Sequence, residues 1–265
     1  MLVQRTEDLS LLEVNDIEVR FGGLIALGGL SFSLEEGGIC SLIGPNGAGK
    51  TTLFNVVSRL YQPSSGSVTF AGRDLLALPA HKIASNGIAR TFQNLALVPG
   101  LSVLDNVMIG AHPRTRGGVW AAASWFPLRS QETRTRTRAL EVLERLDLDR
   151  FAAARCAGLP YGTLKRIELA RSLMSDPRLL LLDEPASGLT HSEVDELASV
   201  ITSIRDEFSM TVLLVEHHMG MVMSVSDSIV VMELGRKIAE GTPQEIQSNA
   251  RVIAAYLGEP EEATS

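Results

Sequence analysis

The stretch GPNGAGKTT, from Gly44 to Thr52, decides the fold of this chain. The apolar run ICSLI precedes it and LFNVV follows it, which predicts a buried strand, a glycine-rich loop and a helix in succession. The spacing fits G-x-x-x-x-G-K-[ST], in which glycines let backbone N–H groups approach the phosphates of a nucleotide. The alternative, a glycine turn with a surface lysine, leaves the flanking strand and helix unexplained. The residues expected to surround the phosphates are Gly44, Pro45, Asn46, Gly47, Ala48, Gly49, Lys50, Thr51 and Thr52.

Four side chains are expected to act on such a nucleotide. Lys50 would reach the β- and γ-phosphates, and the Thr51 hydroxyl would bind Mg²⁺. A second motif, LLLLDEP, places Asp183 at the end of a buried strand, where its carboxylate can hold Mg²⁺ through the water shell of the ion. The adjacent Glu184 could polarise an attacking water molecule. Together, the phosphate loop and the two carboxylates predict an NTPase or a nucleotide-dependent switch.

Strand and helix patterns alternate along most of the chain. LLEVNDIEVRF, GSVTFAG, MTVLLVEHH and DSIVVMELGRKIAEG read as strands, and continuous apolar runs such as LLLLD are typical of parallel strands buried on both faces. Between residues 95 and 173 the pattern is mostly helical. The sequence therefore predicts an α/β core, formed by residues 1–94 and 174–265, interrupted by a helical subdomain over residues 95–173.

Several helices carry recognisable ends and faces. A short helix is expected over residues 79–87, and Ser102 is expected to cap the helix that follows it. Thr190 and Glu193 predict a capping box before a longer amphipathic helix. The apolar face expected for the helix over residues 132–148 consists of Leu140, Leu143 and Leu146.

Composition narrows the class of protein. The chain has 265 residues, a formal net charge of −7 and 45% hydrophobic residues, which fits a globular protein and disfavours a general nucleic-acid binder. The two cysteines, Cys40 and Cys156, offer neither a disulfide framework nor metal-ligand spacing, and Cys40 is expected in the core. The beginning, MLVQRTEDLSLL, predicts no secretory signal, and no apolar run has the ~18–20 residues of a membrane span. We expect a soluble cytoplasmic protein.

A second anion-binding helix start is expected far from the phosphate loop. The stretch LPYGTLKRIELAR, Leu159 to Arg171, places Gly162 at the start of a helix that carries several basic residues. Free backbone N–H groups and the helix dipole favour an anion at such a position. The motif by itself does not say which anion this helix start would meet.

The order of these motifs resembles that of ABC-transporter ATPase subunits, from about Leu11 to Gly258. GIARTFQN, LPYG, EHHM and AAYLGE most resemble the ATPase subunit of bacterial branched-chain amino-acid importers. The resemblance implies an α/β P-loop NTPase fold with a mostly parallel core sheet, an N-terminal antiparallel β portion and a helical subdomain. It also implies ATP and Mg²⁺ as ligands and ATP hydrolysis coupled to transport.

The resemblance assigns further roles by position. Phe21 matches the aromatic residue on which adenine stacks, although a strand-end core aromatic is the plainer interpretation. Gln93 matches the glutamine that touches Mg²⁺ and the attacking water; by itself it is a loop glutamine. His217 matches the histidine that contacts the γ-phosphate, because the family places this histidine directly after the glutamate, which selects it over His218.

The resemblance also explains the second helix start. In the family, two subunits enclose two nucleotides, and the segment with Tyr161 and Gly162 faces the γ-phosphate bound to the other subunit. Here the usual Leu-Ser-Gly-Gly-Gln reads Leu-Pro-Tyr-Gly-Thr, and Pro160 has neither the hydroxyl nor a backbone N–H to donate. Thr190 stands where an acidic or amide residue is usual. A heterodimer with a second ATPase is therefore favoured, and a homodimer is the alternative.

The implied partners are integral-membrane permease subunits and, indirectly, a periplasmic solute-binding protein, which would place the chain on the cytoplasmic face of the membrane. No nucleic-acid partner is expected. Residues 117–130, with both tryptophans, suggest a hydrophobic flap or, less simply, a surface that meets the permease or lipid. The rival functions are the ATPase of lipopolysaccharide export, a non-transport ABC ATPase and a P-loop kinase.

Overall fold

The computed structural model describes residues 10–91, 95–111 and 125–257, and describes the side chains of the helix at Trp125 from Gln131 onward. The chain divides into two compact units. The first comprises the chain up to Ala80 and from Thr202 onward, and the second runs from His81 to Ile201. The predicted helical subdomain, residues 95–173, lies within the second unit. Among the described residues, no helix is both long and apolar enough to cross a membrane.

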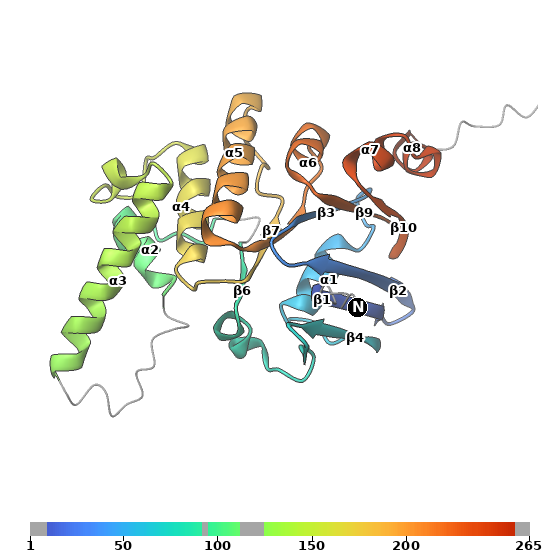
Figure 1. The fold of residues 1–265 in the computed structure, drawn as a ribbon, viewed down its shortest axis with the longest axis horizontal. Helices are drawn as coiled ribbons and strands as arrows, with labels where there is room; N and C mark the ends of the chain where they lie inside the picture. The colour runs from blue at the N-terminus through green and yellow to red at the C-terminus, as the bar shows by residue number, and fades with distance from the viewer. Residues whose placement is uncertain (1–9, 92–94, 112–124, 258–265) are drawn as a thin grey trace, which may run out of the picture. The chain divides into compact units, whose positions relative to one another are not determined.

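The first unit begins with an antiparallel sheet in the order β2-β1-β4-β5 (Figure 1). The alternation of apolar and polar residues in the first strand buries one face, as expected for a sheet with one covered side. This sheet confirms the expected N-terminal antiparallel portion. Its strands are β1 (Ser10–Phe21), β2 (Leu24–Glu35), β4 (Ser65–Phe70) and β5 (Arg73–Asp74).

Parallel strands form the centre of the first unit. Strand β3 (Ile39–Ile43) pairs in parallel with β8 (Thr211–Val215) on one side and with β9 (Ser228–Glu233) on the other. Every residue of β3 and β8 is buried, because both faces of these strands are covered. Strand β10 (Arg236–Gly241) adds an antiparallel edge beside β9. The continuous apolar runs were therefore correctly predicted as buried parallel strands.

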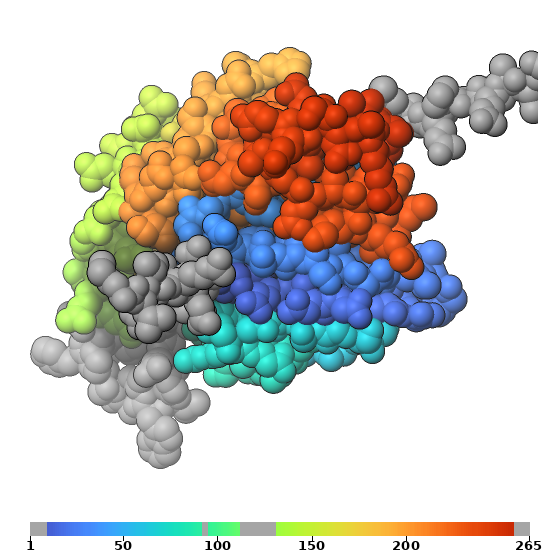
Figure 2. Space-filling model, turned by 45° about the vertical axis from the view of Figure 1, so that its right-hand side comes forward, coloured from blue at the N-terminus to red at the C-terminus, as the bar shows by residue number. Residues whose placement is uncertain are grey.

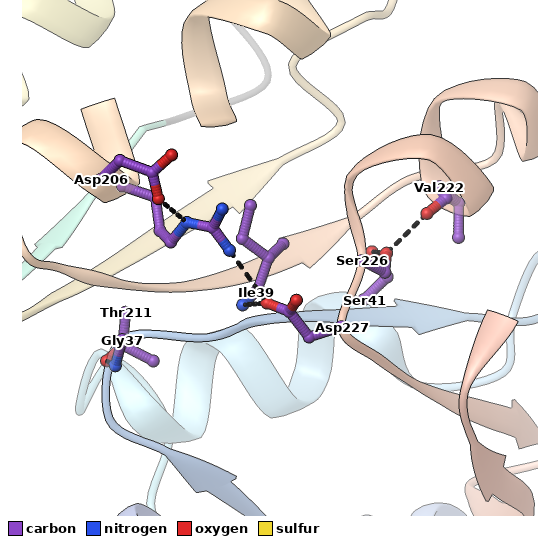
Figure 3. Close-up of polar contacts among 9 residues, drawn as sticks. Gly37, Ile39, Ser41, Asp206, Thr211, Val222, Ser226 and Asp227 are labelled. Atoms are coloured by element: carbon purple, nitrogen blue, oxygen red, sulfur yellow. Dashed lines mark hydrogen bonds and ion pairs between the residues drawn. The ribbon is translucent and has the colours of Figure 1, made fainter. Parts of the chain in front are cut away.

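Side chains fix the N-terminal ends of these strands (Figure 3). The Asp227 carboxylate accepts the Ile39 N–H at 2.7 Å and also pairs with Arg205 at 3.2 Å. The Thr211 hydroxyl accepts the Gly37 N–H at 2.9 Å. These bonds tie β3 to its neighbours at one end. They thereby fix where the other end, and the phosphate loop after it, emerges from the sheet.

The helices of the first unit complete its core. They are α1 (Lys50–Val57), α6 (Met219–Val225), α7 (Pro243–Gln247) and α8 (Ala250–Leu257). Val222 of α6, Ile246 of α7 and Val252 of α8 pack in one buried cluster with residues of β3 and β9. Figure 2 shows this C-terminal segment, in red, lying against the blue strands of the N-terminal part. The last helices are thus integral to the fold.

The second unit pairs two short parallel strands, β6 (Ile88–Arg90) and β7 (Leu179–Asp183), and is otherwise mostly helical. Most of helix α5 belongs to it, since the division of the chain falls after Ile201. The described residues of this unit also form short 3₁₀ turns. Its helices and turns are α2 (Val103–Ile109), α3 (Trp125–Arg145), α4 (Tyr161–Leu173), α5 (His191–Phe208), η2 (Ala84–Asn86), η5 (Asp149–Phe151) and most of η1 (Ala80–Lys82).

Some expected details are confirmed and others are wrong. The Ser102 hydroxyl accepts the Asp105 N–H, so the predicted cap of α2 is present. The helix expected over 79–87 consists instead of two 3₁₀ turns, separated at Ile83 and ended by Gly87 in the left-handed region. Leu140 is exposed, because the buried face of α3 follows Ala139, Val142, Leu143 and Leu146, a spacing closer to 3.6 residues per turn.

Cys40 lies in β3 and is buried, which confirms it as a core residue. Burial raises the pKa of its thiol to about 12, although a hydrogen bond with Ser228 acts in the opposite direction. A thiol with so high a pKa stays protonated and unreactive at neutral pH. Cys156 is also a buried free thiol, in the second unit.

Candidate nucleotide site

The phosphate loop, Gly44–Thr52, leaves the buried end of β3 and enters α1, as predicted. Gly44 has a φ of 150°, and a Cβ there would lie 2.1 Å from the Met232 carbonyl oxygen. Gly49, the residue before α1, has a φ of 98°, and its Cβ would lie 2.6 Å from the Ala26 carbonyl oxygen. Both positions therefore require glycine, because backbone of other strands passes too close for a side chain.

Lys50 is 8% exposed and lies over the loop that precedes it. Its ammonium donates to the carbonyl oxygens of Gly44 at 2.6 Å and Pro45 at 3.0 Å. This places a positive charge at the loop, beside the start of α1, where an anionic group is also favoured by the helix dipole. The Thr51 side chain is exposed at the same helix start, and Thr52 is half-buried. The loop therefore has the charge and the free hydroxyl that a Mg²⁺–nucleotide complex requires.

Residues far along the chain support the loop. The Gly235 N–H, in the turn between β9 and β10, donates to the Ala48 carbonyl at 3.1 Å. Burial raises the pKa of the Tyr256 hydroxyl, while a backbone hydrogen bond with Gly44 acts in the opposite direction. Helix α8 thus touches the first glycine of the loop. These supports were not predicted from the sequence, although Tyr256 lies within the segment AAYLGE.

Phe21 ends β1 and is 47% exposed, so it is not the core aromatic of the plainer interpretation. Its ring meets that of Tyr61 edge to face, with centroids 5.2 Å apart. A nucleotide base can stack on the face of an aromatic ring that is exposed in this way. Tyr61 was not predicted, and it fixes the orientation of the Phe21 ring.

His217 follows β8 at the same edge of the sheet as the phosphate loop. Leu42 and Val215 are register partners in β3 and β8, so both strands end at this edge. Ligands of parallel sheets bind at the carboxyl ends of the strands. The His217 side chain is 55% exposed, and Glu216 before it is fully buried. The structure therefore brings the phosphate loop and His217 to one edge.

In the second unit, Asp183 ends β7 and forms an ion pair with Arg90 at the end of β6. The Arg90 guanidinium lies 2.8 Å from the Asp183 carboxylate, and each side chain is only 9% exposed. The parallel pairing of β6 and β7 brings these residues together. Arg90 was not predicted, although it lies within the quoted GIARTFQN. Carboxylate oxygens are ligands that Mg²⁺ prefers, so Asp183 has the chemistry of a metal ligand.

Glu184 has a φ of 48°, in the left-handed region that residues other than glycine seldom adopt. This backbone reversal comes directly after Asp183, the last residue of β7. Glu184 is half-buried, and its carbonyl accepts the Ser187 N–H at 3.1 Å, which closes a turn. Unusual backbone conformations of this kind cluster at functional sites. The geometry is compatible with different roles for the two carboxylates.

Helix α4 begins at Tyr161, and Pro160 before it provides no side-chain cap. The first turn of the helix contacts the loop that follows Glu184. A Cβ on Gly188 would lie 3.2 Å from the Tyr161 ring, and a Cβ on Gly162 would lie 2.8 Å from a Glu193 carboxylate oxygen. The structure thus brings the signature segment, residues 159–163, together with the loop after β7.

Glu193 is held beside Gly162 by Thr190. Its carboxylate accepts the backbone N–H of Thr190 at 2.9 Å and the Thr190 hydroxyl at 2.8 Å, and these two bonds lower the pKa of Glu193. This is the acidic half of the predicted capping box. The two residues therefore link the start of α5 to the start of α4.

The basic residues that the sequence places on α4 bind within the second unit. Lys165 is 5% exposed and lies 5.5 Å from the centre of the Tyr161 ring. Arg166 donates to the Leu146 carbonyl, and Arg171 donates to the Ala96 carbonyl. These side chains hold the helices of the second unit together. The backbone N–H groups at the start of α4 are therefore the part of this helix that would attract an anion. Gln93 lies outside the described residues.

Comparison with known proteins identifies the family. Residues 27–187 match a family model described as ABC transporter, and residues 236–262 match one described as branched-chain amino acid ATP-binding cassette transporter. The high-affinity branched-chain amino acid transport ATP-binding protein BraF of Pseudomonas aeruginosa is 43% identical over 250 residues, covering 94% of this chain and 98% of that protein. LivG of Escherichia coli K12, with the same description, is 40% identical over the same shares.

The fold agrees with that family. The crystal structure of the ADP conformation of MJ1267, an ATP-binding cassette of an ABC transporter, superposes with a TM-score of 0.83 and 29% identity. The match covers 95% of this chain and all of that one. The expected P-loop NTPase fold is confirmed. The chain therefore belongs to the ABC transporter family and is one of its ATP-binding cassettes.

Proposed function

We propose that this chain is the ATP-hydrolysing subunit of an importer for branched-chain or similar hydrophobic amino acids. The observation that carries the proposal is similarity over nearly the full length to branched-chain transport ATP-binding proteins, reaching through the C-terminal segment. That segment, β10 to α8, packs into the core and reaches the phosphate loop. Permease subunits would hold the chain at the cytoplasmic face of the membrane.

The following residues are proposed to hold Mg-ATP. Phe21 would stack on adenine, and the phosphate loop would enclose the phosphates, with Lys50 turning its ammonium from loop carbonyls to phosphate oxygens. Thr51, Asp183 and Gln93 would bind the Mg²⁺ ion directly or through water. When bound, the ion neutralises charge that develops on the phosphates during transfer.

Hydrolysis is assigned to three side chains. Glu184 would polarise the attacking water, and Gln93 and His217 would align that water with the γ-phosphate. Because Asp183 is paired with Arg90 and Glu184 has a reversed backbone, the two adjacent carboxylates have different surroundings. This difference supports one carboxylate acting on the metal ion and the other acting on the water.

The signature segment is proposed to act on a second subunit. Tyr161 and Gly162, at the start of α4, would face the γ-phosphate bound in the partner's phosphate loop. Pro160 offers that phosphate no hydroxyl and no N–H, and a lost charge-assisted hydrogen bond costs about 1.5–3 kcal/mol. This deficit favours a heterodimer in which the partner ATPase supplies a fuller signature segment.

Transport can be tested in cells that lack this gene. Uptake of labelled leucine should fall on deletion, return with the unaltered chain and not return with Lys50→Ala. Uptake of an unrelated sugar in the same cells is the control. Unchanged leucine uptake after deletion would contradict the proposed solute class.

The dimer can be tested with purified protein. Glu184→Gln protein with Mg-ATP should double in mass by light scattering, either alone or with a second ATPase that copurifies with the permease. A strictly monomeric protein in both mixtures would contradict the shared nucleotide site. Hydrolysis by a homodimer at the rate of the mixed pair would contradict the heterodimer.

A further inference from the structure

The turn between β8 and α6 gathers three metal-ligating side chains. Glu216, His217 and His218 are consecutive, and one ligand atom from each lies within 4.8 Å of the other two. The Glu216 carboxylate oxygen is 3.1 Å from Nδ1 of His218 and 3.7 Å from Nδ1 of His217. The two imidazole rings lie with centroids 4.5 Å apart. The nucleotide site uses only His217 of this group.

These separations match those between ligands of one zinc ion. Zn²⁺ binds histidine nitrogen and carboxylate oxygen at 2.0–2.2 Å in tetrahedral geometry, so two of its ligand atoms are about 3.3 Å apart. The two nitrogen–oxygen distances at Glu216 lie on either side of that value. A metal ion in place of the hydrogen between Glu216 and His218 would therefore require each of these two oxygen–nitrogen distances to change by only about 0.4 Å or less.

The surroundings of Glu216 also suit a ligand. Its carboxylate is fully buried, and Oε2, the oxygen that faces the two imidazole rings, accepts the backbone N–H groups of His217 at 2.9 Å and His218 at 3.2 Å. Such secondary hydrogen bonds orient a carboxylate ligand in metal sites. The histidine side chains are 55% and 30% exposed, which leaves the group open to ions from solvent.

We propose that Glu216, His217 and His218 form a binding site for a borderline divalent transition-metal ion, with Zn²⁺ as its best match. Three protein ligands and one open position satisfy the coordination of Zn²⁺, whereas Mg²⁺ prefers six oxygen ligands. Bound Zn²⁺ would hold the His217 ring toward Glu216. Because His217 is proposed to contact the γ-phosphate, Zn²⁺ would inhibit ATP hydrolysis.

The first test measures binding of Zn²⁺ itself to the purified chain without nucleotide, by competition with a chromophoric chelator. His218→Asn removes one ligand and keeps an amide that can bond to Glu216, so the apparent Kd should rise at least about tenfold. His81→Asn, at an exposed 3₁₀ turn outside the group, is the matched control and should bind as the unaltered chain does. Equal zinc affinity of the His218 variant and the unaltered chain, or no binding by either, would overturn the proposal.

A second test measures ATP hydrolysis at fixed Mg-ATP and buffered free Zn²⁺. The unaltered chain and His81→Asn should be inhibited, and His218→Asn should resist the same free Zn²⁺ concentration. Equal inhibition of all three proteins would refute inhibition through this site. The binding test does not depend on hydrolysis, so failure of the proposed ATPase function and failure of the zinc site give different results.

Discussion

The carboxyl ends of β3 and β7 both carry residues proposed to act on the nucleotide, but they are built differently. After β3, glycines let the loop pass against neighbouring backbone, and Lys50 lies on carbonyl groups of its own loop. The structure at the carboxyl end of β7 depends instead on a buried ion pair between Asp183 and Arg90, which are 93 positions apart in the sequence. The residues of the first end are consecutive in the sequence, while the second end needs two residues that only the pairing of β6 with β7 brings together. Substitutions at the two ends should therefore have different effects on stability, nucleotide binding and the rate of hydrolysis.

The largest effect is expected from Glu184→Gln at the end of β7. Loss of a general base lowers a rate by about 10²–10⁴-fold, while the neutral amide leaves nucleotide binding intact. Phosphate release and binding of a fluorescent ATP analogue would measure the two properties separately. Glu196→Gln, on the exposed side of α5, is the matched control. ATP turnover by Glu184→Gln at the control rate would remove the role assigned to Glu184.

The next effect concerns the charge pair itself. Arg90→Ala leaves the Asp183 carboxylate buried without its guanidinium, which should lower the free energy of unfolding by about 3–5 kcal/mol. Arg138→Ala breaks an exposed pair with Asp176 and should cost less than about 1 kcal/mol. Urea denaturation of both variants measures the difference. Similar losses in the two variants would mean that the end of β7 does not depend on Arg90.

This contrast also explains what the sequence could predict. The phosphate loop is readable because its glycines, its lysine and the flanking strand and helix lie within a few residues of one another. Asp183 and Glu184 are readable as a motif, but the Arg90 partner is not, because only strand pairing brings it close. The burial of Lys165, a polar residue of α4, is likewise not readable from the sequence. Burial of such residues depends on neighbours that no local pattern reveals.

A smaller effect is expected from Gly44→Ala at the end of β3. The new Cβ would meet the Met232 carbonyl at 2.1 Å, so the backbone must shift, at a cost of about 1–3 kcal/mol. Because the shift displaces the loop, ATP affinity should fall together with stability. Gly100→Ala, where no atom lies within 4 Å of the added Cβ, is the matched control. Thermal unfolding and ATP titration would measure both losses, and an unchanged Gly44→Ala protein would contradict the close packing of the loop.

The smallest effect is expected from Phe21→Ala, which tests whether binding at the β3 end relies on backbone more than on side chains. Base–aromatic stacking contributes about 1–3 kcal/mol, and the half-exposed ring should give the lower end, about a fivefold rise in the Kd for ATP. Tyr61→Ala should give a smaller rise, because Tyr61 only orients the Phe21 ring at its edge. Titration with ATP and with inorganic triphosphate separates the two contributions, since only ATP carries the base. If Phe21→Ala weakened both ligands equally, the ring would act on the loop rather than on adenine. Phosphate binding at the end of β3 would then depend on the Phe21 side chain as well as on the glycines of the loop.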